Sequence, residues 1–487
     1  MYTPTNPVSQ VGTLFRNMVD IQSLQGCFLK RCPHKLLKLL ALLLLVITLY
    51  TTCYVTTTTL SQSGGPIFSL FVLLILAMIA GQCLKLINIP PMLGMLLVGI
   101  GLSNIPTVKE WTVLDAQVSS DLKNISLMLI LMKGGLSLDI MDIKRVGFAV
   151  IRLAFLPCFV EATVFAIMSV LLLDLPWIWG FLLGFVIAAV TPAIIVPCLD
   201  ELKKRKFKIE ENNITTMLIS ASSFDDVLAI SAYMVCLSSA FTSDKPLYLQ
   251  ILQGPLEIVL GTALGVVSGV ILWLVPPVSS GKVDSRLRSL LLLSFGLCSV
   301  FGMSYIGFNG SGPLSVIVMS LTAVKGWGED STVTGVVDCL WVLGEPLLFG
   351  LVGRDIQFEF ITPEIMWKSL IIIFVALFFR LITAFLAVSW TGLTVKEKVF
   401  VSFSWIPKAT VQAAIGSYAL AVAVEKGEEE VVMGYSRTIV TVAVLIILVS
   451  APLGSMLMYF TAPLLLDKVE SGHCQLGEED CVEEQSA

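Results

Sequence analysis

About fourteen apolar stretches, most of them near the length that crosses a bilayer, follow one another along this chain of 487 residues. A spanning helix needs about 20 apolar residues, because each residue advances an α-helix by about 1.5 Å. Charged residues make up only 14% of the chain, against about 25% in a soluble domain. The sequence therefore predicts an all-α polytopic membrane protein with about fourteen transmembrane helices. The stretches lie near 36–60, 66–87, 91–104, 120–138, 147–173, 177–200, 213–242, 250–276, 287–303, 312–327, 333–353, 365–392, 397–424 and 436–465.

The distribution of Lys and Arg predicts how these helices cross the membrane. If residues 1–35 form a cytosolic N-terminus, the alternate connections between spans are cytosolic as well. Together these connections hold most of the basic residues, including the run from Lys203 to Lys208. Cytoplasmic loops carry this excess of positive charge, so both termini are expected in the cytosol, with residues 466–487 as an acidic tail. We interpret the Lys203–Lys208 run as a topogenic loop and expect no nucleic-acid partner.

Two of the predicted spans are interrupted by proline in polar company. Pro192 and Pro197 follow Thr191 in the first, and Pro407 precedes Lys408 in the second. Measured from candidate repeat starts near 66 and 287, Pro192 and Pro407 lie about 126 and about 120 residues along (192 − 66 and 407 − 287). Matching breaks of this kind are typical of inverted repeats whose discontinuous helices cross at mid-membrane.

The repeats divide the chain into a predicted order of segments. Repeat one covers about 66–243, a linker helix covers 250–276, and repeat two covers about 287–465. An odd number of spans separates the repeats, which gives them opposite topologies. Unwound carbonyl groups at the crossing can coordinate a cation.

Two adjacent carboxylates, Asp225 and Asp226, lie inside an apolar stretch. A charge at the bilayer centre costs about 2.5–3.5 kcal/mol on insertion scales, so such a pair indicates a water-filled cavity that binds a cation. Ser222 lies one turn before Asp226 and offers a further oxygen ligand. Oxygen ligands suit a hard alkali cation. A carboxylate binds either a proton or a cation, so competition at this pair combined with alternating access predicts antiport.

We single out four further charged residues within predicted spans. Lys408 is too deep to reach the interface easily, and we expect Asp225 to be its partner; the alternative is a helix-end lysine at a cytosolic re-entrant turn. Glu161 and Arg380 precede Pro192 and Pro407 by similar distances, which predicts a structural ion pair, with a gating or substrate role as the alternative. Glu345 could join a polar network or face a cavity.

The motifs ASSFDDVLAI, TPAIIVP, NGSGPL, EPLLFGLVG and WIPKATVQAAIGS together resemble the monovalent cation/proton antiporters, and most closely the sodium/hydrogen exchangers of solute carrier family 9, subfamily B. The resemblance covers about residues 66–465. It implies the sodium/proton antiporter fold, with 36–60 as an extra N-terminal transmembrane helix, and a homodimer whose core domain moves across a dimerisation domain.

The same resemblance assigns roles to individual residues. Asp226 looks like the carrier of Na+ and H+, Asp225 like the partner of Lys408, and Thr191 like part of the crossover. Na+ is therefore expected at Asp226 and Asp225. Glu161 and Arg380 look like an interdomain-type ion pair. Glu345 and Arg354 depart from the residues expected at those places.

Sodium (or lithium)/proton exchange is thus the predicted function, and the transported ions are substrates, with no cofactor expected. The first alternative is a potassium/proton antiporter of the same fold, and the second is a cation channel or a non-transporting sensor. An enzyme is not expected, because no nucleophile–base set or metal cluster is visible. We expect location in the plasma membrane, with endosomal, lysosomal or mitochondrial membranes as alternatives.

Overall fold

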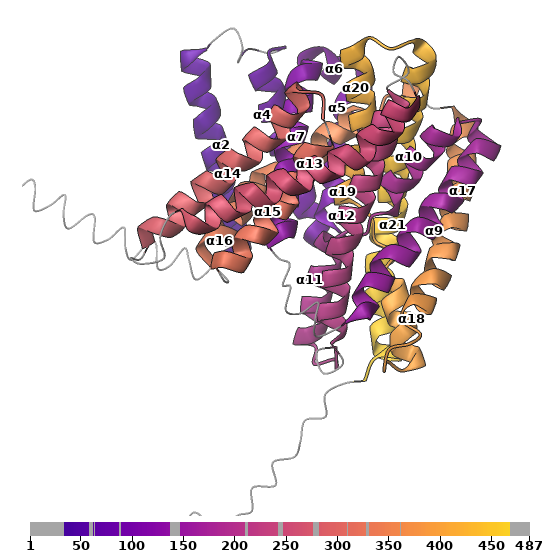
Figure 1. The fold of residues 1–487 in the computed structure, drawn as a ribbon. Helices are drawn as coiled ribbons and strands as arrows, with labels where there is room; N and C mark the ends of the chain where they lie inside the picture. Colours follow the sequence, from indigo (N-terminus) through magenta and orange to yellow (C-terminus); the bar gives the residue numbers. More distant parts are fainter. Residues whose placement is uncertain are drawn as a thin grey trace, which may run out of the picture. The chain divides into compact units, whose positions relative to one another are not determined.

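The computed structural model confirms an all-α architecture over the residues that it describes (Figure 1). The predicted cytosolic N-terminus (1–35) and acidic tail (466–487) lie almost entirely outside those residues. The described ranges are 34–57, 62, 64–86, 89–136, 147–209, 213–241, 247–275, 282–308, 310–327, 331–360 and 362–467.

The described part of the chain forms two compact units. The first takes in the described residues up to Ile75 and also Glu110–Leu114. It contains helix α2 (His34–Thr56) and the beginning of α4 (Pro66–Leu86). The Tyr50 ring of α2 stacks on Phe71 of α4, with centroids 3.9 Å apart. The Ser69 hydroxyl donates to the carbonyl of Val113 at 2.7 Å, which fixes residues 110–114 to the start of α4.

The second unit, Leu76–Lys109 and Asp115 onward, contains two groups of packed helices. The helix carrying the aspartate pair belongs to the first group, which we refer to as the aspartate bundle: α9 (Phe148–Leu173), α10 (Trp177–Ala188), α11 (Pro192–Lys204), α12 (Ile214–Ala240), α17 (Pro363–Ala387), α18 (Val395–Phe403), α19 (Thr410–Gly416), α20 (Tyr418–Lys426) and α21 (Glu430–Leu465). Within it α9 packs against both α10 and α17 (Figure 1).

The second group, the wall bundle, packs against the aspartate bundle. It consists of α5 (Pro91–Asn104), α7 (Ala116–Leu136), α13 (Leu247–Leu274), α14 (Lys282–Tyr305), α15 (Ser311–Trp327) and α16 (Ser331–Arg354). Helices α12 and α19 of the aspartate bundle contact α13, α15, α7 and α16 of the wall bundle. Two short helices, α6 (Pro106–Trp111) and the 3-10 turn η1 (Phe358–Phe360), lie in connections.

A row of glycines brings α13 and α15 together. A Cβ atom on Gly261 would lie 2.8 Å from the carbonyl oxygen of Ser311, and one on Gly265 would lie 2.7 Å from that of Ser315. Larger residues would push the two backbones apart. These glycines therefore pack inside the wall bundle.

Ten helices within the described ranges are long and apolar enough to cross a membrane. The other four predicted stretches also form helices. Helix α5 has 14 residues and α15 has 17, fewer than any of the ten, and α7 is more polar than they are. The stretch 397–424 is divided into α18, α19 and α20. Spans enclosed by protein need neither full length nor full apolarity, because neighbouring helices satisfy their polar groups. The chain is a multi-pass membrane protein.

Both predicted helix interruptions are present. Helix α10 ends at Ala188, the backbone is extended at Ala189 and Thr191, and Pro192 begins α11 at the position where a missing N–H costs nothing. Pro407 lies in the non-helical segment between α18 and α19. Pro197 was also expected at a break, and this is wrong: it lies inside α11, which continues past it because one lost backbone hydrogen bond is tolerated there.

Candidate ion-binding site

The two discontinuous helices cross where their backbones are unwound. The Thr191 N–H donates to the carbonyl of Pro407 at 3.1 Å. In return, the Thr191 hydroxyl oxygen accepts hydrogen bonds from the backbone N–H groups of Ala409 (2.6 Å) and Thr410 (3.2 Å). The first N–H groups of a helix have no partner within the helix, so Thr191 caps the start of α19 from the other repeat.

The carbonyl groups at the end of α10 accept hydrogen bonds from Gln412 of α19 and from Lys408, which lies just before α19. The Gln412 side-chain amide donates to the carbonyls of Ala189 (2.7 Å) and Val186 (3.1 Å), among others. The Lys408 ammonium donates to the carbonyl of Ile187 at 2.7 Å. Carbonyls at a helix C-terminus carry partial negative charge and find no water inside a membrane, so a cation and an amide stabilise them.

Four buried charged side chains form one network beside this crossing. Oxygen Oε2 of Glu161 contacts both the guanidinium of Arg380 and the Lys408 ammonium, the latter at 2.8 Å. Oxygen Oδ2 of Asp225 lies 3.3 Å from Arg380 Nη2 and accepts from the backbone N–H of Val190 at 2.8 Å. All four side chains are fully buried. Two carboxylates and two cations give a formal charge of zero.

The expected pairing of Lys408 with Asp225 is wrong. The ammonium lies on Glu161 and on α10 carbonyls, and the bond to Asp225 is made by Arg380. The physical reason is the shape of the guanidinium, whose fork of donors reaches two carboxylates at once. Glu161 and Arg380 are in contact, in a larger network than a single pair.

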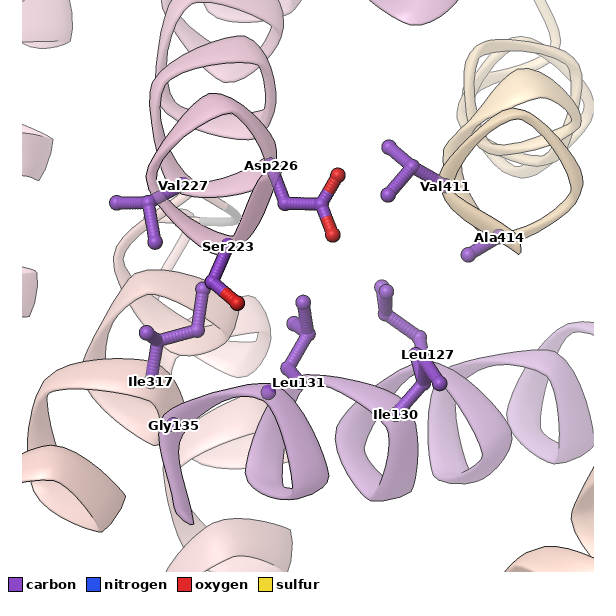
Figure 2. A pocket seen from close by; sticks show the side chains of 11 residues that line it. Leu127, Ile130, Leu131, Gly135, Ser223, Asp226, Val227, Ile317, Val411 and Ala414 are labelled. Carbon is purple, nitrogen blue, oxygen red and sulfur yellow. The ribbon is translucent and has the colours of Figure 1, made fainter. Parts of the chain in front are cut away.

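The Asp226 carboxylate points into a pocket whose lining residues come from both bundles (Figure 2). Its oxygen Oδ1 is buried and has no hydrogen-bond partner among the residues that the structure describes. Ser223 is the other polar side chain among the lining residues. The remaining lining residues are Leu127, Ile130, Leu131, Gly134 and Gly135 of α7, Val227 of α12, Ile317 of α15, and Val411 and Ala414 of α19.

The other predicted site residues lie around this pocket or away from it. The Ser222 hydroxyl donates to the carbonyl of Ile219 within its own helix, and Ser222 is not among the lining residues. Thr191 lies at the helix crossing. Glu345 lies on α16, outside the pocket lining. Arg354 is the last residue of α16.

Gln412 and Glu257 have structural roles that the sequence reasoning missed. Gln412 stands within a quoted motif, WIPKATVQAAIGS, yet its capping of α10 follows only from the crossing. Glu257 is a carboxylate within a predicted span, so the same rule that singled out Asp225 and Glu345 could have found it.

The fold and the site together indicate an ion-coupled transporter. Crossed broken helices, a neutral buried ion-pair network and a further carboxylate in a pocket are features of ion-coupled secondary transporters.

The comparisons with known proteins narrow this class to one family. The family model described as "Sodium/hydrogen exchanger, transmembrane" matches residues 67–462. Human "Sodium/hydrogen exchanger 9B2" is 38% identical over 446 residues, covering 90% of this chain and 82% of the relative. The protein of the same name from Xenopus tropicalis is 40% identical, with 84% and 76% covered. Human "Sodium/hydrogen exchanger 9B1" is 35% identical, with 83% and 79% covered.

A solved structure shows the same fold. It is that of the sodium proton antiporter MjNhaP1 from Methanocaldococcus jannaschii, with a TM-score of 0.67 at 20% identity, covering 82% of this chain and 98% of that one. The chain belongs to the sodium/hydrogen exchanger family, and the predicted resemblance to subfamily B is confirmed. It is a cation/proton antiporter by family and fold, a transporter and not an enzyme, whose ions are substrates and not cofactors.

Proposed function

We propose that this protein exchanges Na+ or Li+ for H+ by alternating access, with Asp226 as the group for which the cation and the proton compete. The observation that carries the proposal is a difference in charge balance. The four charges of Glu161, Asp225, Arg380 and Lys408 cancel. Asp226 is a fifth formal charge in a mostly apolar pocket, and within the described part of the chain its Oδ1 has no hydrogen-bond partner.

A carboxylate in such a pocket is stable only when its charge is neutralised. A bound proton does this, and so does a bound alkali cation, with the Ser223 hydroxyl as a further oxygen ligand. Both cannot occupy the same carboxylate, which makes each displace the other. Asp225 takes part through its electrostatic influence on the pocket, because it is not among the lining residues, and its Oδ2 is held by Arg380 and the Val190 N–H.

One group that binds either ion implies a ratio of one cation to one proton. The ammonium of Lys408 is held by Glu161 and by α10 carbonyls. It therefore need not release a proton during the cycle, and the exchange is electroneutral.

The pocket also supports a route for alternating access. One side is formed by α12 and α19, and the other by α7 and α15. Movement of the aspartate bundle along the wall bundle would carry Asp226 from one membrane face to the other. A homodimer in the lipid bilayer, with both termini in the cytosol, would hold the wall bundle still during that movement.

The test is transport by proteoliposomes that contain an internal pH dye. Pulses of Na+, Li+ and K+ are applied to the wild type, to Asp226→Asn, and to Asp174→Asn as a matched control. Asp174 is an exposed residue with a left-handed backbone conformation that asparagine also adopts readily. We expect Na+ and Li+ to drive proton movement in the wild type and control, and Asp226→Asn to fall to the level of protein-free vesicles.

Two further results of the same experiment decide the details. Proton movement with K+ alone would replace the proposal by potassium/proton exchange. Clamping the membrane potential with valinomycin should leave the Na+ response unchanged if the exchange is electroneutral. Retained exchange in Asp226→Asn would remove this aspartate from the mechanism.

A further inference from the structure

Glu257 is a buried carboxylate that lies outside the ion-pair network and outside the Asp226 pocket. It lies on α13, within the apolar segment Pro255–Leu274, and only 2% of it is exposed. Its Oε1 accepts from the Ser238 hydroxyl of α12 at 2.9 Å, and its Oε2 accepts from the backbone N–H of Gly310 at 2.8 Å. Its own carbonyl accepts from the Ser311 hydroxyl at 3.0 Å. Three helices therefore meet at this residue: α12, α13 and the start of α15.

The glycine motif NGSGPL is built around this contact. A Cβ atom on Gly310 would lie 2.6 Å from Cβ of Met234 on α12, and it would also run into the Glu257 carboxylate. Only glycine lets the backbone N–H at 310 approach this closely. A Cβ on Gly312 would lie 2.9 Å from Cα of Val300 on α14, so this glycine lets the same segment pack closely against α14.

The contact between Ser238 and Glu257 joins the two bundles. Ser238 lies on α12 twelve residues beyond Asp226, which is about 18 Å along the helix axis. Glu257, Gly310 and Ser311 all belong to the wall bundle and its connections. Movement of one bundle past the other must break the Ser238 bond, whereas the bonds to Gly310 and Ser311 can persist.

We propose that Glu257 is a positioning residue that holds the C-terminal end of α12 in the conformation seen here and releases Ser238 when the aspartate bundle moves. This inference rests on the proposed alternating access. Two donors on the Glu257 carboxylate suit a position inside the membrane. When Ser238 leaves, the Gly310 N–H remains bound, so the charge always has a hydrogen-bond donor. The hydrogen bond between Ser238 and Glu257 thus sets how often Asp226 is exposed at each face of the membrane.

Three substitutions separate this role from an ordinary packing role. Ser238→Ala removes the bond between the bundles and leaves the bond to Gly310 in place. Ser239→Ala is the matched control, because the Ser239 hydroxyl donates to the carbonyl of Val235 in its own helix. Glu257→Gln can preserve the geometry, since its amide oxygen accepts from Gly310 and its NH2 can donate to the serine hydroxyl.

The readout is a cysteine placed at Ile130, which lines the pocket on α7. A membrane-impermeant maleimide is applied to each face of oriented proteoliposomes, and the same variants with Ile130 unchanged give the background from native cysteines. We expect Ser238→Ala to change the ratio of labelling at the two faces by about tenfold, the effect of losing one hydrogen bond to a charged group. The apparent KM for Na+ should shift in opposite directions at the two faces. Ser239→Ala and Glu257→Gln should match the parent.

The outcomes keep this inference apart from the proposed function. If Ser238→Ala labels like Ser239→Ala while Na+/H+ exchange is intact, the positioning role is overturned and the exchange stands. If Ser238→Ala only lowers thermal stability, with labelling and KM unchanged, the bond is structural and the role is again overturned. If the parent shows no exchange in the same vesicles, the proposed function fails. The labelling ratio then still decides whether the bond between Ser238 and Glu257 controls access to the pocket from the two membrane faces.

Discussion

Asp225 and Asp226 are neighbours in sequence and have opposite surroundings. Asp225 is fully buried among Arg380, the Val190 N–H and the rest of a network whose formal charges cancel. Asp226 points into an apolar pocket in which Ser223 is the other polar lining residue. Successive residues on a helix diverge by about 100°, so a pair of carboxylates on one helix can serve two regions. The network fixes the crossing of the broken helices, whereas the pocket leaves one charge to be neutralised by a mobile ion.

The largest effect should come from breaking the network. In Glu161→Gln, Arg380 and Lys408 lose the carboxylate oxygen that they share. Leaving buried charges without their partner costs about 3–5 kcal/mol, so the free energy of unfolding should fall by about that amount. Thermal unfolding in detergent measures it, with Asp226→Asn as the control that should lose no stability. Equal unfolding temperatures for Glu161→Gln and the wild type would show that the network is not what stabilises the crossing.

A smaller effect should follow from Asp225→Asn, which sharpens the contrast between the two aspartates. The asparagine oxygen still accepts from the Val190 N–H, but the network then has a formal charge of +1. That charge partly neutralises Asp226, so the pocket should hold a cation less tightly, and the KM for Na+ should rise by about tenfold. A Na+ titration of proton movement measures this change. An unchanged KM would make the role of Asp225 structural only.

The smallest effect concerns the two serines on α12. The hydroxyls of Ser222 and Ser223 both donate to the carbonyl of Ile219, at 3.0 and 3.1 Å. Only Ser223 lines the pocket. Ser223→Ala should therefore raise the KM for Na+ by about two- to fivefold through loss of an oxygen ligand, and Ser222→Ala should leave it unchanged. The reverse order would return the ligand role to Ser222, as first predicted from the sequence.

Much of the fold could be predicted because hydropathy and proline act locally. Each of the fourteen apolar stretches forms a helix or a broken helix, and the breaks fall at Pro192 and Pro407. The divergence of Asp225 and Asp226 also follows from helix geometry alone. These features depend on a few neighbouring residues and the bilayer, not on which helices meet.

The partners of the buried charges could not be predicted in the same way. Glu161 lies on α9, Arg380 on α17 and Lys408 in the segment between α18 and α19. More than 200 residues of chain separate Glu161 from the other two, and long side chains reach several acceptors. The spacing of these residues along the sequence does not predict that Arg380 contacts both Glu161 and Asp225, or that Lys408 pairs with Glu161. The prediction for Pro197 was wrong for a related reason, because a membrane helix continues past a proline where neighbouring groups donate to the freed carbonyl, and the sequence does not show those neighbours.

The reciprocal capping at the crossing has a consequence for biosynthesis. The donors that Thr191 caps lie 218 residues later in the chain, and those that cover the end of α10 lie similarly far away. At about 5–20 residues per second, a ribosome needs roughly 10–40 s to supply them. During that interval the first broken helix stands in the membrane with exposed carbonyl groups. A chain truncated between the repeats should therefore be unable to satisfy these carbonyl groups inside the membrane and should not fold stably.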